Sequence, residues 1–160
     1  MLNENLEFAT APQDVKDAFI GKVDKLPMNA GTKFFKRTGF PLVGPKGITA
    51  WWSFVETTKL PSGIVADGLR QSEELAHRVG ASHRDYQRVR AAVSERFGNS
   101  MRHLLIAELS VGVWGFAGKA SGQKEFNDPE LRNVYLIGGA VQVWIPNLTI
   151  SHIHEIPRAI

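Results

Sequence analysis

The sequence predicts an α+β domain that is built mainly from antiparallel β-sheets and carries a helical insert. The first observation is the order of the elements, which runs from a helix and two strands through a helical stretch to several strands. The second is the hydrophobic period, which changes near residue 100 from helical spacing to strict alternation. With 160 residues and 43% hydrophobic content, the chain is expected to form one domain, 1–160, around a single core.

The first half of the chain is expected to contain one helix and two strands. Apolar residues recur at helical spacing over 11–26, which predicts a short amphipathic helix within an N-terminal helical segment, 1–28, that Pro27 ends. Two β-prone runs follow, at 30–40 and 48–58, on either side of a loop rich in proline and glycine.

The middle of the chain reads as two helices, over 63–80 and 82–99. Ser82 is the expected N-cap of the second helix, and Asp85 three residues later resembles a capping box. The apolar residues of this helix are expected to be buried on one face: Tyr86, Val89, Val93 and Phe97. Its arginines do not share one face, so a solvated helix surface is expected for Arg84, Arg88, Arg90 and Arg96.

The remainder of the chain is expected to form strands. Strict alternation predicts a strand over 104–116, and a polar loop then precedes strands at 133–138, 140–146 and 149–156. The residues expected on the buried side of the first of these strands are Leu105, Ala107, Leu109, Val111 and Val113.

Composition excludes some chemistry. The chain has no cysteine, which removes disulfides and thiolate catalysis. The N-terminus lacks a basic region followed by an apolar one, and no apolar run is long enough to span a membrane. We therefore expect no membrane partner and a protein that is cytoplasmic, or delivered into a target cell without a cleavable signal. The formal net charge of +3 suits an anionic ligand or nucleic acid.

Three short blocks, in order along the chain, carry a family resemblance. The first, AGTKFFKR, ends in Arg37; the second, ITAWWSF, contains Trp51, Trp52 and Ser53; the third, GGAVQVWIP, contains Gln142. Together they resemble the ADP-ribosyltransferase superfamily, particularly its bacterial toxins and the related NAD glycohydrolase toxins. The resemblance extends in outline from about residue 31 to residue 156.

This resemblance implies a fold, a substrate and a set of site residues. The fold would be ADP-ribosyltransferase-like, and the domain would be a toxin or effector that cleaves the nicotinamide–ribose bond of NAD, with no metal. Gln142 and Arg37 would be catalytic. The dinucleotide would be bound by five residues: Arg37, Trp51, Trp52, Ser53 and Gly139.

The acceptor of ADP-ribose stays open between water and a macromolecule. The chain lacks the serine-threonine-serine and glutamate-x-glutamate signatures of arginine-modifying relatives. Gln142 cannot accept a proton or supply a full negative charge, which favours hydrolysis or an unusual acceptor. A toxin also implies a cognate immunity protein, expected to be acidic, that a basic rim would attract by charge: Lys33, Lys36, Arg37 and Lys46.

Two other classes of function are compatible with the sequence. A basic nucleic-acid-binding or RNase-like toxin domain would use His103 or another histidine as acid or base. A non-catalytic interaction domain is the third possibility.

His152 and His154 share a strand face as metal ligands would, but no third ligand has suitable spacing, so we expect a half-exposed strand instead of a metal site. Glu155 matches the late carboxylate of the superfamily only loosely.

Overall fold

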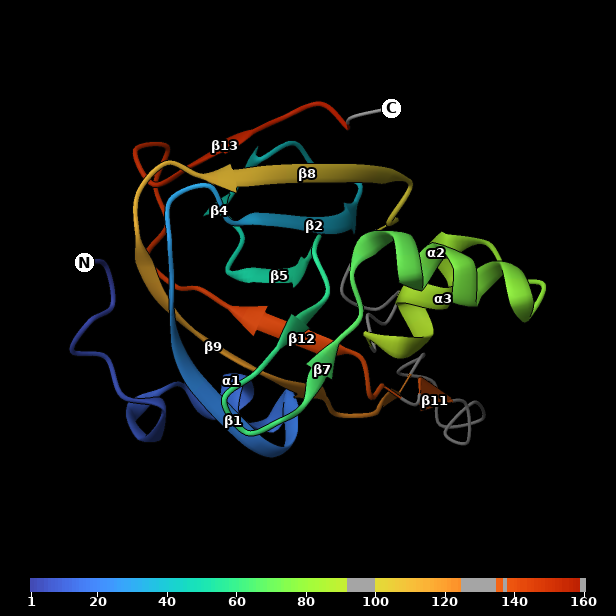
Figure 1. Ribbon diagram of the computed structural model, residues 1–160, viewed down its shortest axis with the longest axis horizontal. Coiled ribbons are helices and arrows are strands. Elements are labelled where there is room, and N and C mark those ends of the chain that lie inside the picture. The colour runs from blue at the N-terminus through green and yellow to red at the C-terminus, as the bar shows by residue number, and fades with distance from the viewer. Residues whose placement is uncertain (92–99, 125–134, 137, 159–160) are drawn as a thin grey trace.

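The computed structural model describes residues 1–91, 100–124, 135–136 and 138–158, and its centre is a seven-stranded sheet (Figure 1). The strand order is β1-β9-β12-β5-β2-β8-β13, and every pairing between these strands is antiparallel. In that order the bounds are Phe19–Met28, Val113–Ala120, Val141–Trp144, Trp51–Phe54, Lys33–Thr38, His103–Leu109 and Ile153–Glu155. The predicted α+β class with mainly antiparallel sheet is confirmed.

Short elements surround this sheet. Three two-stranded pairs join β3 (Val43–Gly44) to β4 (Gly47–Ile48), β6 (Thr58–Lys59) to β7 (Val65–Ala66), and β10 (Gln123–Lys124) to β11 (Tyr135–Leu136). The helical elements are η1 (Phe8–Thr10), α1 (Gln13–Asp17), α2 (Leu69–Arg78) and α3 (His83–Arg90). None of the helices in the described part of the chain is long and apolar enough to span a membrane.

The helix predicted over 11–26 is wrong beyond its first turn. Helix α1 has only five residues, and β1 begins at Phe19 and pairs with β9 along its length. Gly21 has a φ of 74°, which a helix interior does not allow, and the register of β1 shifts just after it, as in a β-bulge. Pro27 is tolerated because β1 is an edge strand, where a missing N–H donor is not required.

The single strand predicted over 104–116 is wrong: this stretch contains two strands, β8 and the start of β9, which pair with different neighbours in the sheet. The chain turns between Leu109 and Val113, which leaves Val111 42% exposed, contrary to the prediction for that residue. Leu105, Ala107, Leu109 and Val113 are buried as expected. Strand β9 also continues to Ala120, into the predicted polar loop. The strand predicted over 133–138 corresponds to β11, and the other late strands to β12 and β13.

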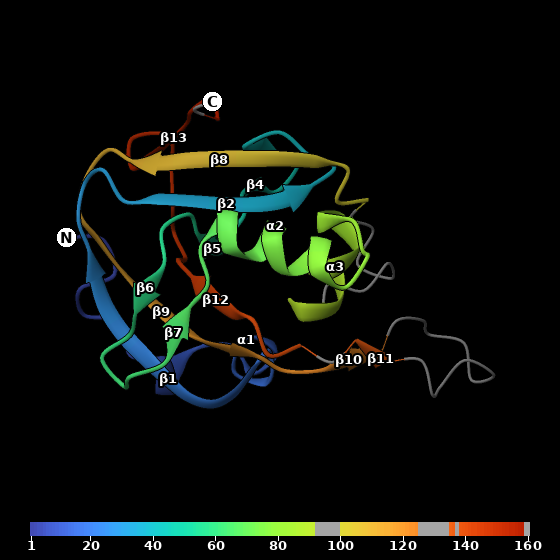
Figure 2. The ribbon, with the colours of Figure 1, turned by 45° about the vertical axis from the view of Figure 1, so that its right-hand side comes forward.

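Helices α2 and α3 lie side by side near one end of the sheet (Figure 2). Ser82 caps α3 as predicted, because its side chain accepts a hydrogen bond of 3.1 Å from the backbone N–H of Asp85. The predicted apolar face is wrong at Val89, which is 37% exposed, whereas Gln87 and Arg88 are buried. Nη2 of Arg88 donates to the carbonyl oxygen of Ser100 at 3.4 Å, and Gln87 borders the cavity described below. The remaining predicted positions, Val93, Arg96 and Phe97, lie outside the described residues.

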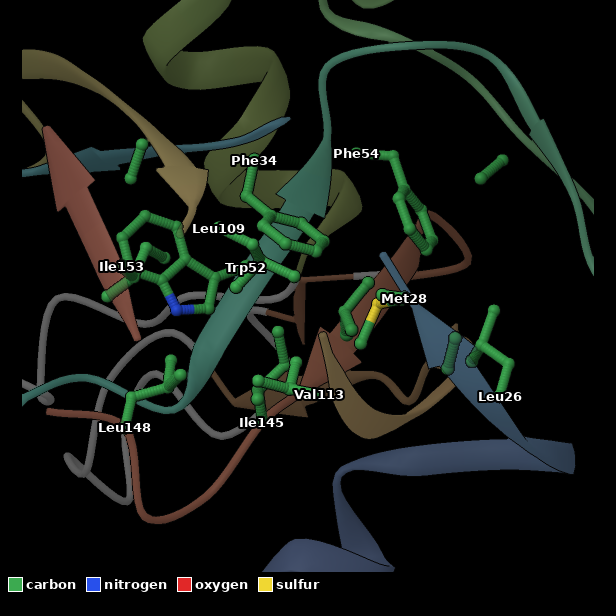
Figure 3. Packing of buried hydrophobic residues seen from close by; sticks show 14 of the residues in the cluster. Leu26, Met28, Phe34, Trp52, Phe54, Leu109, Val113, Ile145, Leu148 and Ile153 are labelled. Atoms are coloured by element: carbon green, nitrogen blue, oxygen red, sulfur yellow. The ribbon is translucent and has the colours of Figure 1, made fainter. Parts of the chain in front are cut away.

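Hydrophobic residues pack on both faces of the sheet. The main core contains Phe34, Trp52, Phe54 and Val143 on one face, and Figure 3 shows Phe34 and Trp52 packed together within it. On the other face, α1 and the preceding segment cover Phe116 and Trp144, and α2 covers Phe35. The candidate site lies over β2, β5 and β12, between α1 on one side and α2 on the other.

Phe34 tests how strongly the sheet depends on the main core. Its side chain is fully buried against Trp52 and Phe54, with ring centroids 6.4 and 5.5 Å away. Phe34→Ala should lower the free energy of unfolding by about 3 to 5 kcal/mol in urea denaturation, because it removes buried area and leaves a cavity. Ile150→Ala, at a side chain that is 74% exposed, should change it by less than about 0.5 kcal/mol. Equal effects of the two substitutions would contradict this packing.

Candidate functional site

One cavity brings together most of the residues that the sequence singled out. Its volume is about 950 Å³, and its wall includes five of the predicted site residues: Arg37, Trp51, Trp52, Ser53 and Gln142. Gly139 is not part of the wall. The cavity lies under the connection that joins β2 to β5, and the N-terminal segment contributes Asp14, Asp17 and Ala18 to its opposite side.

Strand register explains why distant residues meet there. Phe35 on β2 pairs with Ser53 on β5, and Trp51 on β5 pairs with Trp144 on β12, so these four side chains share a face. Side chains two residues apart on a strand point the same way. Arg37 and Gln142 therefore lie on that face as well, whereas Trp52 points into the main core on the opposite face.

The amide of Gln142 is fixed by the backbone. Its Nε2 donates a hydrogen bond of 2.8 Å to the carbonyl oxygen of Ala18, which follows α1. Because a carbonyl can only accept, this contact determines which end of the amide faces it. Within the described part of the chain, Oε1 of Gln142 has no hydrogen-bond partner, so it remains available as an acceptor at the cavity wall.

Arg37 is oriented by the first residue of α3. Its Nε donates a hydrogen bond of 3.0 Å to Nδ1 of His83. Nε2 of His83 lies 2.8 Å from Oγ of Ser72, which itself donates to the carbonyl oxygen of Leu69 at 2.8 Å. The Ser72 hydroxyl has only one hydrogen, so it must accept from His83. His83 is therefore neutral, with its proton on Nε2 and its Nδ1 lone pair facing Arg37.

Burial and charge support this protonation state. Burial lowers the pKa of His83 from 6.5 to about 4, and the positive charge of Arg37 contributes in the same direction. Burial also lowers the pKa of Arg37, which Glu73 partly offsets. The hydrogen bond from Arg158 lowers the pKa of Glu73, and Arg158 Nη1 lies 2.8 Å from Oε2 of that residue. No described residue forms an ion pair with Arg37, so its two terminal nitrogens can bind a ligand.

The two predicted tryptophans have different surroundings. Trp51 is half-buried and packs against Phe19 and Trp144, with ring centroids 5.4 and 6.5 Å away. Trp52 is 2% exposed, and its Nε1 donates to the carbonyl oxygen of Thr49 at 3.0 Å. Trp51 therefore has the greater surface to offer a ligand, whereas Trp52 is mainly a core residue that borders the cavity.

The glycine pair before Gln142 forms a tight turn against the protein itself. Gly138 and Gly139 have φ values of 69° and 93°, where other residues are strained. A Cβ on Gly138 would lie 2.5 Å from the carbonyl oxygen of Ala120, and one on Gly139 would lie 3.2 Å from the Arg90 guanidinium. These glycines make room for β9 and α3. A contact between Gly139 and a ligand stays a prediction. The closeness of Gly139 to the Arg90 guanidinium also shows that Arg90, expected on a solvated surface, lies against the protein.

Other candidates from the sequence lie apart from the cavity. Lys33 and His103 are exposed and do not belong to its wall, whereas Lys36 and Lys46 do. His152 Nδ1 accepts from the backbone N–H of Thr149, and His154 Nε2 lies 3.4 Å from Glu108. The described residues contain no group of three or more histidine or carboxylate side chains able to hold a metal. The exposed Glu155 does not border the cavity either.

His83 and Ser72 are the site residues that sequence reasoning missed. His83 stands directly after the N-cap Ser82, and Ser72 is on α2, far from Arg37 in sequence. A capped helix start predicts a helix but not the side chain that its first residue contacts. Only the packing of α2 and α3 beside β2 brings the three residues together.

Comparisons with known proteins give little further guidance. No protein-family model and no curated protein sequence matches the chain. Among solved structures, the chain is similar to the structure of Tse6 in complex with Tsi6, with a TM-score of 0.46 and 12% sequence identity. The similarity covers 98% of this chain and 88% of that chain. At this level it assigns neither a fold family nor a function.

The neutral His83 should make stability depend on pH. Its pKa is about 4 in the folded protein and near 6.5 when unfolded, so folding favours the neutral form. This contribution to the free energy of unfolding is complete above about pH 6.5 and declines as the pH falls toward 4. Between pH 7 and pH 4, wild type should lose more stability in urea denaturation than His83→Gln.

The control is His77→Gln, at an exposed position on α2, which should lose stability in parallel with wild type. The His83 ring resonances, followed by NMR, should titrate with a midpoint near 4. A midpoint near 6.5 would contradict the assigned protonation state.

Proposed function

We propose that the chain is an NAD-consuming toxin or effector domain of the ADP-ribosyltransferase type, which cleaves the nicotinamide–ribose bond. One observation carries the proposal: Arg37, Trp51, Ser53 and Gln142 come from three neighbouring strands, share one face and border one cavity. The cavity, at about 950 Å³, is large enough for a dinucleotide-sized ligand.

In this mechanism Arg37 binds a phosphate of NAD. A guanidinium offers donors in a planar fork that matches phosphate oxygens. His83 engages Nε, so the two terminal nitrogens are held in a defined orientation before the ligand arrives. Orienting the donors in advance reduces the entropy that binding must remove.

Gln142 acts on the ribose. Its Nε2 is anchored to Ala18, which leaves Oε1 to accept a hydrogen bond from a ribose hydroxyl or to orient a water molecule. As the bond to nicotinamide breaks, the ribose becomes oxocarbenium-like and flattens, and a fixed acceptor can stabilise that geometry better than the ground state. Trp51 and Ser53 border the same space and would contact the nicotinamide.

The acceptor of ADP-ribose is water or a macromolecule. A glutamine supplies neither a base nor a full charge, which favours hydrolysis or an unusual acceptor. A producing cell would need protection, so the proposal includes an acidic immunity protein that covers the cavity. Arg37, Lys36 and Lys46 at the cavity wall would attract it by charge. The domain would act in the cytoplasm of the producing or the target cell.

The direct test is incubation of the purified protein with NAD, with and without cell lysate, while free nicotinamide is measured. Release in buffer alone would indicate hydrolysis, and release that requires lysate would indicate a macromolecular acceptor. The proposal fails if nicotinamide is released in neither condition.

Gln142→Ala should lower kcat by about a hundredfold and change KM for NAD little, because the amide acts mainly in the transition state. Gln142→Glu keeps an acceptor oxygen, loses the amide donor and introduces the charge found in transferase relatives. Its activity therefore shows whether an acceptor alone is sufficient or the amide is required. The control is Gln71→Ala, on α2 and outside the cavity wall, which should keep wild-type kinetics. Wild-type turnover by a folded Gln142→Ala protein would remove the glutamine from the mechanism.

Arg37→Ala should raise KM for NAD about tenfold or more, because it removes a charged hydrogen bond on the order of 1.5 to 3 kcal/mol. Lys33→Ala is the matched control, since Lys33 is an exposed cation at the other end of β2. Steady-state kinetics of both variants check this expectation. If KM rises no more in Arg37→Ala than in Lys33→Ala, Arg37 does not bind the substrate.

A further inference from the structure

Lys36 occupies an unusual position for a lysine. It leaves β2 on the face opposite to Arg37, next to Leu105, its partner on β8. Its ammonium lies 5.4 Å from the ring centroid of Trp52, and the side chain is partly buried at the cavity wall. Because both Lys36 and Arg37 border the cavity, the cavity reaches both faces of β2.

In the described part of the chain, no carboxylate forms an ion pair with this cation. Among the described residues, Lys36 forms neither an ion pair nor a hydrogen bond, and its ammonium lies over the ring of Trp52. Withdrawing an ammonium from water without an anion costs free energy, which a cation–π contact offsets only in part. Burial accordingly lowers the pKa of Lys36 from 10.5 to about 8.

The hairpin of β3 and β4 encloses the same part of the cavity. Ile48 of the hairpin and Leu42 just before it pack against the main core, and the turn carries Lys46, a second cation at the cavity wall. Among the described residues of the wall, the acidic ones are Asp14 and Asp17, and both come from α1 rather than from the hairpin. The part beneath the hairpin thus combines apolar walls with two cations.

We propose that Lys36 is an anion-binding residue, which contacts a phosphate or pyrophosphate group of a ligand lying beneath the β3–β4 hairpin. The identification of that ligand as a dinucleotide rests on the proposed function, but the anion site follows from Lys36, Trp52 and Lys46 themselves. A bound anion would place a negative charge beside Lys36, where no described carboxylate does so. The low dielectric of a partly buried site strengthens the contact. Lys36 and Arg37 would then hold an extended anionic ligand from the two sides of β2.

A purely structural lysine and an anion-binding lysine differ in their response to Lys36→Met. This substitution keeps the length and the apolar contact with Trp52 but removes the uncompensated charge. For an anion site, thermal unfolding should occur at an equal or higher temperature, because the native protein no longer holds an unpaired cation. For a structural lysine, the melting temperature should fall, since the cation–π contact is lost.

The test is isothermal titration with inorganic pyrophosphate, ADP and NAD as separate probes. Lys36→Met should weaken pyrophosphate binding about tenfold or more, Lys36→Arg should retain most of it, and Lys33→Met should match wild type. Weakened binding of ADP and NAD by the same factor would identify the phosphates as the shared determinant, whereas an effect on pyrophosphate alone would identify a free phosphate site.

The inference is overturned if wild type does not bind pyrophosphate, or if Lys36→Met binds it as wild type does. Failure of the proposed function is a separate result. A protein that binds pyrophosphate through Lys36 but releases no nicotinamide from NAD would retain the anion site and lose the catalytic assignment.

Discussion

The alternation of side chains along β2, β5 and β12 is the constraint on which the rest of the structure depends. On one face of these strands, Phe34, Trp52 and Val143 form the main core. On the other, Arg37, Trp51 and Gln142 meet at the cavity. A shift of one residue in any of these pairings would exchange the two sets, so burial of the core also fixes the register of the site.

The helices add what the strands cannot supply. A strand aims the arginine side chain in one direction, but its long stem retains several rotamers, and His83 at the start of α3 restricts them. His83 is in turn held by Ser72 of α2. The N-terminal segment does the same for Gln142 through the carbonyl of Ala18. Arg37 and Gln142 are thus each oriented by an element that lies outside the sheet.

Local sequence patterns predicted much of this fold because the deciding interactions were local. The capped start of α3 and the β-prone runs of β2 and β5 follow from residues within a few positions of each other. Strand β1 was missed because helical spacing over 11–26 competes with a long ladder to β9, nearly a hundred residues away. Gly21 and Pro27 disfavour a strand in the local sequence, but the structure accommodates Gly21 in a bulge and Pro27 at the sheet edge.

The residues of the candidate site likewise fall into those that the sequence identified and those that depend on contacts distant in sequence. The family resemblance selected residues that register then brings to one cavity, with the exception of Gly139, whose space is taken by Arg90. It selected neither His83 nor the role of Lys36, because both depend on packing between elements that are distant in sequence.

The cations of the cavity point to a common physical requirement. Arg37 keeps two nitrogens without an ion-pair partner in the described part of the chain, and Lys36 has an aromatic ring in place of a carboxylate. A protein optimised for stability alone would pair such charges or leave them in water. Elsewhere this chain does pair them, as Arg158 does with Glu73 on α2. The contrast between the paired surface and the unpaired cavity is what an anionic ligand, bound in preference to any internal carboxylate, would require.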